Sequence, residues 1–167
     1  MRIFLAVVAL GIGGCVAAIV AGAAKWDRAT RADVAKLAAT AATGSGDVRH
    51  DSLDGVPPPV AQYFKKVLRD GHSMVRSISA TQEAEFFING AWRPLRATQQ
   101  FVVTPPGFVW DARIHMAPML DASVRDAYLG GRGKMQASFY GVYSLADQIG
   151  KPELNAGALQ RFLGEAV

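Results

Sequence analysis

Three polar side chains, Asp111, Arg113 and His115, alternate with apolar residues between positions 108 and 116. Side chains two residues apart on a β-strand point to the same face, so the spacing predicts that all three share one face. A carboxylate beside a histidine can orient it as a general base, which makes Asp111 and His115 the candidate catalytic residues of a hydrolase. No Gly-x-Ser-x-Gly nucleophile motif accompanies them. Antiparallel sheets often carry a polar face in water, and a solvated outer face is the favoured interpretation.

The opposite face of the same predicted strand is apolar. It carries Phe108, Trp110 and Ile114, and a later predicted strand adds Phe139. Such side chains are core by default. They become the wall of a ligand site if the sheet curls and the covering helices leave a gap. These four residues are therefore the candidate contacts for a lipophilic ligand.

Other kinds of chemistry find little support in the sequence. His50, His72 and His115 are far apart and none has a second histidine three or four residues away, so we expect no metal site. The glycine-rich stretch at residues 131–133 lacks the distal glycine and the Ser/Thr of a phosphate loop, and we expect no cofactor. The net charge of +4 comes from scattered basic residues, which argues against a nucleic-acid partner.

Residues 3–24 form a run of 22 residues without a charge. As a helix the run would measure about 33 Å, enough to cross a hydrocarbon core of about 30 Å. Its length favours a retained single-pass membrane anchor. The lipid bilayer is then the expected partner of residues 3–24, and the bacterial plasma membrane is the expected location. A cleaved signal segment and lipidation at Cys15 are the alternatives. The positive charges on the two sides leave the membrane side of the remaining chain undetermined.

The rest of the chain predicts an α+β fold. Helical spacing of Val34, Leu37 and Ala38 indicates a juxtamembrane helix over residues 25–42, followed by a flexible break at residues 43–46. Alternating residues and turn signals then predict a five-strand antiparallel meander, which could curve into a half-barrel, with flanking helices at residues 57–68 and 152–167. The predicted divisions are an anchor or signal segment (residues 1–25), a juxtamembrane helix and linker (residues 26–55), and an α+β domain (residues 56–167).

Several blocks of this sequence resemble an uncharacterised bacterial family, a domain of unknown function. They are PPGFVWDARI (residues 105–114), MAP (116–118), VRDAY (124–128) and Gly131-x-Gly133-x-Met135. The resemblance runs from about Leu53 onward and implies no assigned activity. Similar proteins continue past this point with further strands, so the resemblance implies a chain truncated at its C-terminal end.

Three functions remain open on the sequence. The first is a membrane-anchored module of the bacterial envelope that binds a lipophilic ligand on its apolar sheet face. The second is a structural or assembly protein of the envelope without a small-molecule site. The third is a hydrolase that uses His115 and Asp111. The aromatic sheet face beside a membrane anchor favours the binding module, and a non-enzymatic function is favoured over an enzymatic one.

Overall fold

The computed structural model describes residues 1–41 and 46–165. Two compact units share these residues. One unit combines Met1–Ala41 with Ser77–Val167, and the other is Ala42–Arg76. Residues 26–41, which include most of the predicted juxtamembrane helix, belong to the first unit.

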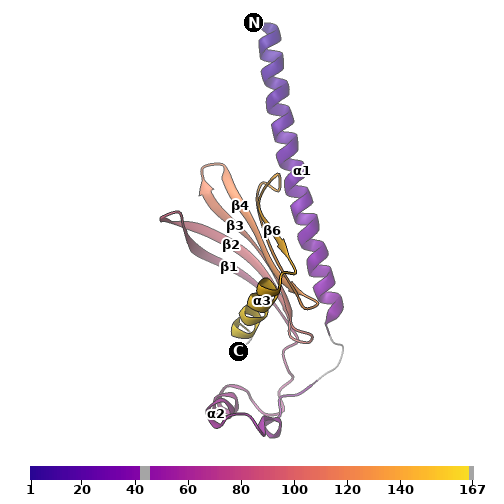
Figure 1. Cartoon of the computed structure of the whole chain (residues 1–167), viewed down its shortest axis with the longest axis vertical. Helices are drawn as coiled ribbons and strands as arrows, with labels where there is room; N and C mark the ends of the chain where they lie inside the picture. The colour runs from indigo at the N-terminus through magenta and orange to yellow at the C-terminus, as the bar shows by residue number, and fades with distance from the viewer. Residues whose placement is uncertain (42–45, 166–167) are drawn as a thin grey trace. The chain divides into compact units, whose positions relative to one another are not determined.

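Helix α1 runs without a break from Arg2 to Thr40. Its first half is fully exposed, and its length and apolar composition suffice to cross a membrane, a property that single-pass anchors share with signal sequences. The second half lies along the sheet (Figure 1). The composition changes at Lys25, but no glycine or proline follows to interrupt the helix, so the predicted anchor and juxtamembrane helix are one element.

The sheet is a six-stranded antiparallel meander with its strands in chain order. Asn89 and Gly90 form the first turn with positive φ of 52° and 76°, as that dipeptide predicts. The predicted α+β class is confirmed, but the prediction of five strands is wrong, because Tyr143–Ile149 adds a sixth. The strands are β1 (Ser77–Ile88), β2 (Ala91–Val102), β3 (Gly107–Ala117), β4 (Leu120–Leu129), β5 (Arg132–Phe139) and β6 (Tyr143–Ile149).

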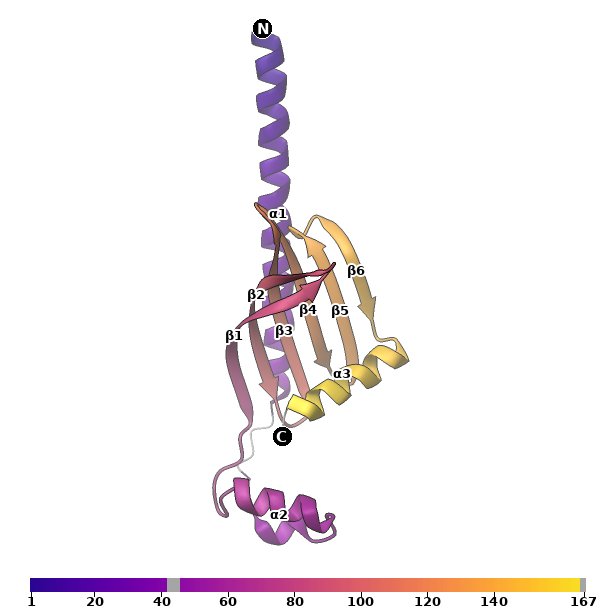
Figure 2. The ribbon, with the colours of Figure 1, turned by 90° about the vertical axis from the view of Figure 1, so that its left-hand side faces the viewer.

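Helices cover both faces of the sheet. Residues 26–40 of α1 lie on one face, where Leu37 packs with Val102, Val109 and Ala127. Helix α3 (Pro152–Glu165) crosses one end of the other face, where its Ala158 and Phe162 are buried. Figure 2 shows the sheet with α1 behind it and α3 in front.

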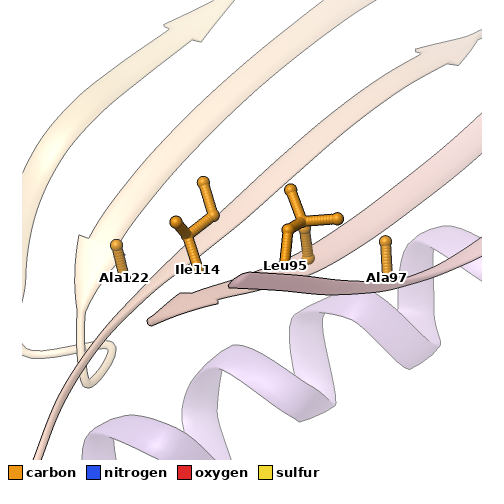
Figure 3. Close-up of a cluster of buried hydrophobic side chains, with 5 residues drawn as sticks. Leu95, Ala97, Ile114 and Ala122 are labelled. Carbon is orange, nitrogen blue, oxygen red and sulfur yellow. The ribbon is translucent and has the colours of Figure 1, made fainter. Parts of the chain in front are cut away.

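A third cluster of buried side chains occupies the middle of the α3 face, away from α3 itself. It contains Leu95, Ala97, Ala112, Ile114 and Ala122. Figure 3 shows side chains of this cluster, with Leu95, Ala97, Ile114 and Ala122 labelled, on the side of the sheet opposite α1. The buried side chains of this cluster are therefore all small or aliphatic.

The second unit holds the 3-10 helix η1 (His50–Leu53) and helix α2 (Pro58–Val67), which begins at a proline as predicted. His50 anchors its loop, since its backbone N–H donates to Asp70 at 2.8 Å. No residue of α2 is buried. The predicted break at residues 43–46 lies, but for its last residue, outside the described residues.

Candidate functional site

The α3 face of the sheet contains an apolar groove of about 420 Å³. Such a volume falls within the range of about 300–1,000 Å³ typical of small-molecule sites. Five of the six strands and α3 contribute to its wall. The lining residues are Phe86, Ile88, Trp110, Ile114, Met116, Ala122, Val124, Asp126, Met135, Ala137, Phe139, Leu145 and Arg161.

Small side chains form the floor of the groove. Val124 of β4 lies opposite Ala137 of β5, and Ala122 lies two residues before Val124 on the same strand. Directly opposed residues of antiparallel strands, and residues two apart on one strand, project to the same face, so these three side chains lie side by side. Larger lining residues flank them, with Ile114 on β3 and Met135 and Phe139 on β5. Small side chains at these three positions leave the space that forms the groove.

Helix α3 closes one end of the groove. Phe162 lies against Phe101 with ring centroids 5.9 Å apart, and it is buried with Phe108 and Tyr128. The helix can approach closely because position 133 is glycine, where a Cβ atom would lie 2.6 Å from the carbonyl oxygen of Leu154. Any side chain there would push α3 outward.

A charged pair lies where α3 meets the groove. Arg161 donates to Asp126 at 2.6 Å and to Glu165 at 2.9 Å. Its guanidinium also lies 4.9 Å from the ring centroid of Phe108 and 5.2 Å from that of Trp110. Burial raises the pKa of Asp126 above its usual value, although the hydrogen bond from Arg161 opposes this shift. The two charged groups of the lining thus neutralise each other.

A chain of side-chain amides fixes the Trp110 ring. The indole N–H donates to Gln82 at 2.7 Å, Gln82 donates to Gln99 at 2.7 Å, and Gln99 donates to Glu165 at 2.6 Å. Because its N–H is satisfied, Trp110 presents a preset apolar surface to the groove. Neither glutamine was predictable from the sequence, since neither belongs to a recognisable motif.

Three of the four predicted ligand contacts lie in the groove, and the fourth does not. Trp110, Ile114 and Phe139 line the groove. Phe108 is completely buried beneath α3 and lies outside the lining. The alternation of β3 placed Phe108, Trp110 and Ile114 on one face, but only the position of α3 decides which part of that face stays open.

The predicted catalytic residues do not come together. Asp111 accepts a hydrogen bond from the indole N–H of Trp26 at 2.7 Å and pairs with Arg113 at 3.1 Å. His115 Nδ1 lies 2.9 Å from Asp121, and the histidine side chain is 51% exposed. Four residues along a strand span about 13 Å, too far for direct contact between Asp111 and His115.

The Asp111 face is an interface with α1 and not the solvated face that the sequence favoured. Asp33 of α1 is buried and lies 2.6 Å from Lys134 Nζ and 3.4 Å from Arg125 Nη1. The Arg125 guanidinium also stacks 4.5 Å from the ring centroid of Trp26. These contacts tie the helix to β4 and β5 through charges.

A second, more open hollow of about 480 Å³ adjoins Asp111 and Arg113 on β3, and β1 and β2 supply its other lining residues. Neither histidine nor cysteine contributes to that lining. Within residues 1–41 and 46–165, no three His, Cys, Asp or Glu side chains group closely enough to hold a metal ion. The apolar groove is therefore the better candidate site.

Comparison with known proteins identifies the family of the sheet and its preceding unit. Residues 54–167, more than half of the chain, match the family of unknown function DUF6920. The chain belongs to the DUF6920 family. No curated protein and no solved structure matches it. The groove, α3 and all six strands of this DUF6920 chain lie within the matched residues, whereas α1 precedes them.

Proposed function

We propose that this DUF6920 chain is a membrane-anchored module that binds the acyl chain of a lipid in its apolar groove. The observation that carries the proposal is the groove itself, about 420 Å³ in volume and walled by aliphatic, aromatic and methionine side chains. Apolar surface of this kind favours an apolar occupant, because transfer of a hydrocarbon from water gains about 0.8 kcal/mol per buried CH₂.

The polar groups of the lining also support an apolar occupant. Asp126 and Arg161 satisfy each other, and the N–H of Trp110 is bonded to Gln82. A polar ligand would therefore have to break existing hydrogen bonds to gain new ones. An acyl chain forms no hydrogen bonds, so it can bind without breaking those of the lining.

The expected source of the ligand is the bilayer. Helix α1 continues directly from its apolar half into the half that packs on the sheet, so membrane anchoring would hold the sheet, and the groove on its other face, close to the bilayer. Methionines such as Met116 and Met135 are suited to a flexible chain, since their unbranched side chains adapt to irregular surfaces.

Mass spectrometry of an organic extract tests the proposal. The full chain, purified in mild detergent from the membranes of expressing cells, should carry one acyl species at near-stoichiometric amount. Val124→Trp places an indole in the groove and should abolish this species. Ala156→Trp, on the exposed side of α3, adds the same group outside the groove and should leave the species in place. Equal amounts of bulk phospholipid in all three proteins would contradict the proposal and favour a structural role.

A further inference from the structure

One end of the sheet lies beside the point where the uncharged run of α1 ends. The first, third and fifth turns of a meander share one end, and here they join β1 to β2, β3 to β4 and β5 to β6. The last of these turns packs directly on α1, because a Cβ atom on Gly141 would lie 2.2 Å from the carbonyl oxygen of Gly22. Figures 1 and 2 both show the three turns on the side toward the N-terminal half of α1.

These three turns carry exposed apolar side chains where polar residues are usual. We call Phe87, Trp92, Met119, Val142 and Tyr143 the apolar rim. Met119 is 91% exposed, and the other four are more than half exposed. Phe87 and Trp92 stack at the tip of the first hairpin with ring centroids 5.2 Å apart. Grouped apolar exposure of this kind marks an interaction surface.

Backbone conformation adds a second, independent observation. Met119 has a positive φ of 63°, in a turn where Asn, Asp or Gly would relieve the strain. A long apolar side chain at a strained, exposed turn lowers stability and gains nothing within the fold. Its benefit must come from outside the chain.

We propose that the apolar rim rests in the headgroup layer of the bilayer that α1 crosses, so that the groove opens toward lipid. Tryptophan and tyrosine favour this layer because one end of each ring is apolar and the other polar. The groove reaches the rim, since Ile88 and Met116 of its lining lie next to the first and second of these turns. The inference rests on the membrane anchoring in the proposed function, but it does not depend on an occupied groove.

Depth-dependent fluorescence quenching tests the inference with the full chain in phosphatidylcholine vesicles. Cys15→Ser removes the native thiol, and the single cysteine of Met119→Cys then carries an NBD label. Thr104→Cys, exposed in the turn between β2 and β3 at the opposite end of the sheet, is the matched control. A nitroxide on the lipid headgroup should quench the Met119→Cys label at least threefold more strongly than the Thr104→Cys label.

Equal and weak quenching at both positions would overturn the inference, as would failure of the chain to float with the vesicles. The result is separable from the proposed function. Strong quenching at position 119 without an extracted acyl species keeps the membrane contact and refutes the groove ligand. An extracted species without quenching keeps the ligand and refutes the contact.

Discussion

Removing the carboxylate of Asp33 should loosen α1 from the sheet far more than removing that of Asp27 on the same helix. Asp33 contacts both Arg125 and Lys134, and the Asp33 and Arg125 side chains are only 8% and 2% exposed. Asp27 contacts Arg113 at 2.9 Å, with the two side chains 49% and 37% exposed. The two carboxylates therefore make similar ion pairs in different surroundings.

The expected loss in the free energy of unfolding depends on how deeply each ion pair is buried. Breaking a buried ion pair leaves an uncompensated charge and costs about 3–5 kcal/mol. An exposed pair contributes about 0–1 kcal/mol. Alanine raises intrinsic helix stability by a similar few tenths of a kcal/mol at both positions, so this gain cancels in the comparison. Asp33→Ala should thus lower the free energy of unfolding by about 2–5 kcal/mol more than Asp27→Ala.

Urea denaturation of the full chain in mild detergent measures this difference. Hydrogen exchange of the Trp26 indole N–H, which is bonded to Asp111, reports locally on the same interface. Asp33→Ala should accelerate this exchange at least tenfold, because a loss of 1.4 kcal/mol already corresponds to a factor of about ten if exchange proceeds through undocking. Equal effects of the two substitutions on denaturation and exchange would refute the argument that burial sets their value.

Three further predictions concern other parts of the fold. Gly22→Ala should lower the free energy of unfolding by about 1–3 kcal/mol, since the added Cβ atom would lie 2.5 Å from the backbone oxygen of Tyr140. Gly13→Ala adds a Cβ atom in open space and should not lower it, so equal urea midpoints for the two variants would contradict this prediction. Met119→Asn should raise the free energy of unfolding by about 0.5–1 kcal/mol by relieving the positive φ, and it should reduce vesicle contact; a lowered urea midpoint would count against the strain. Because burial raises the pKa of Asp126, the folded chain holds that proton more tightly than the unfolded chain, and stability should fall as pH rises from about 3.8 through the raised value. Asp126→Asn should flatten this slope in urea titrations at several pH values, and an unchanged slope would contradict the assignment.

Local patterns in the sequence predicted much of the fold. The dipeptide Asn89-Gly90 located the first hairpin, and alternation along β3 assigned its two faces correctly. The length of the uncharged run predicted a helix long enough to span a membrane. Strand β6 was missed because it has only seven residues and Asp147 interrupts the alternation of Tyr143, Leu145 and Ile149.

The α1 interface was not predictable from alternation alone. Its buried stripe on the helix is Gly22, Trp26, Asp33 and Leu37, at intervals of four, seven and four residues. Asp33 is charged, so in the sequence it breaks the apolar pattern of this stripe. Its burial is possible because Arg125 and Lys134, on strands far along the chain, pair with its carboxylate. No sequence pattern pointed to a partner for the Asp111 face, so solvent exposure was the natural prediction.

The groove, too, was predictable only where it depends on spacing within one strand, and not where it depends on contacts between strands. Residues on one face of β3 followed from spacing, but the hollow depends on Ala122, Val124 and Ala137 meeting across two paired strands. The pairing register of the strands brings these side chains together, and the register cannot be predicted from the sequence of one strand alone. The burial of Phe108 likewise depends on where α3 crosses the sheet.

Photocrosslinking would test the central claim most directly. Cells that express the full chain would be fed a fatty acid carrying a diazirine on its acyl chain, and crosslinked peptides would be mapped by mass spectrometry after irradiation. Residues 3–20 of α1 provide an internal reference for contact with bulk lipid. An acyl chain in the groove predicts additional crosslinks on β3 and β5, within residues 110–116 and 135–139, that Val124→Trp removes and Ala156→Trp retains. Crosslinks confined to α1 in all three proteins would contradict the proposed function.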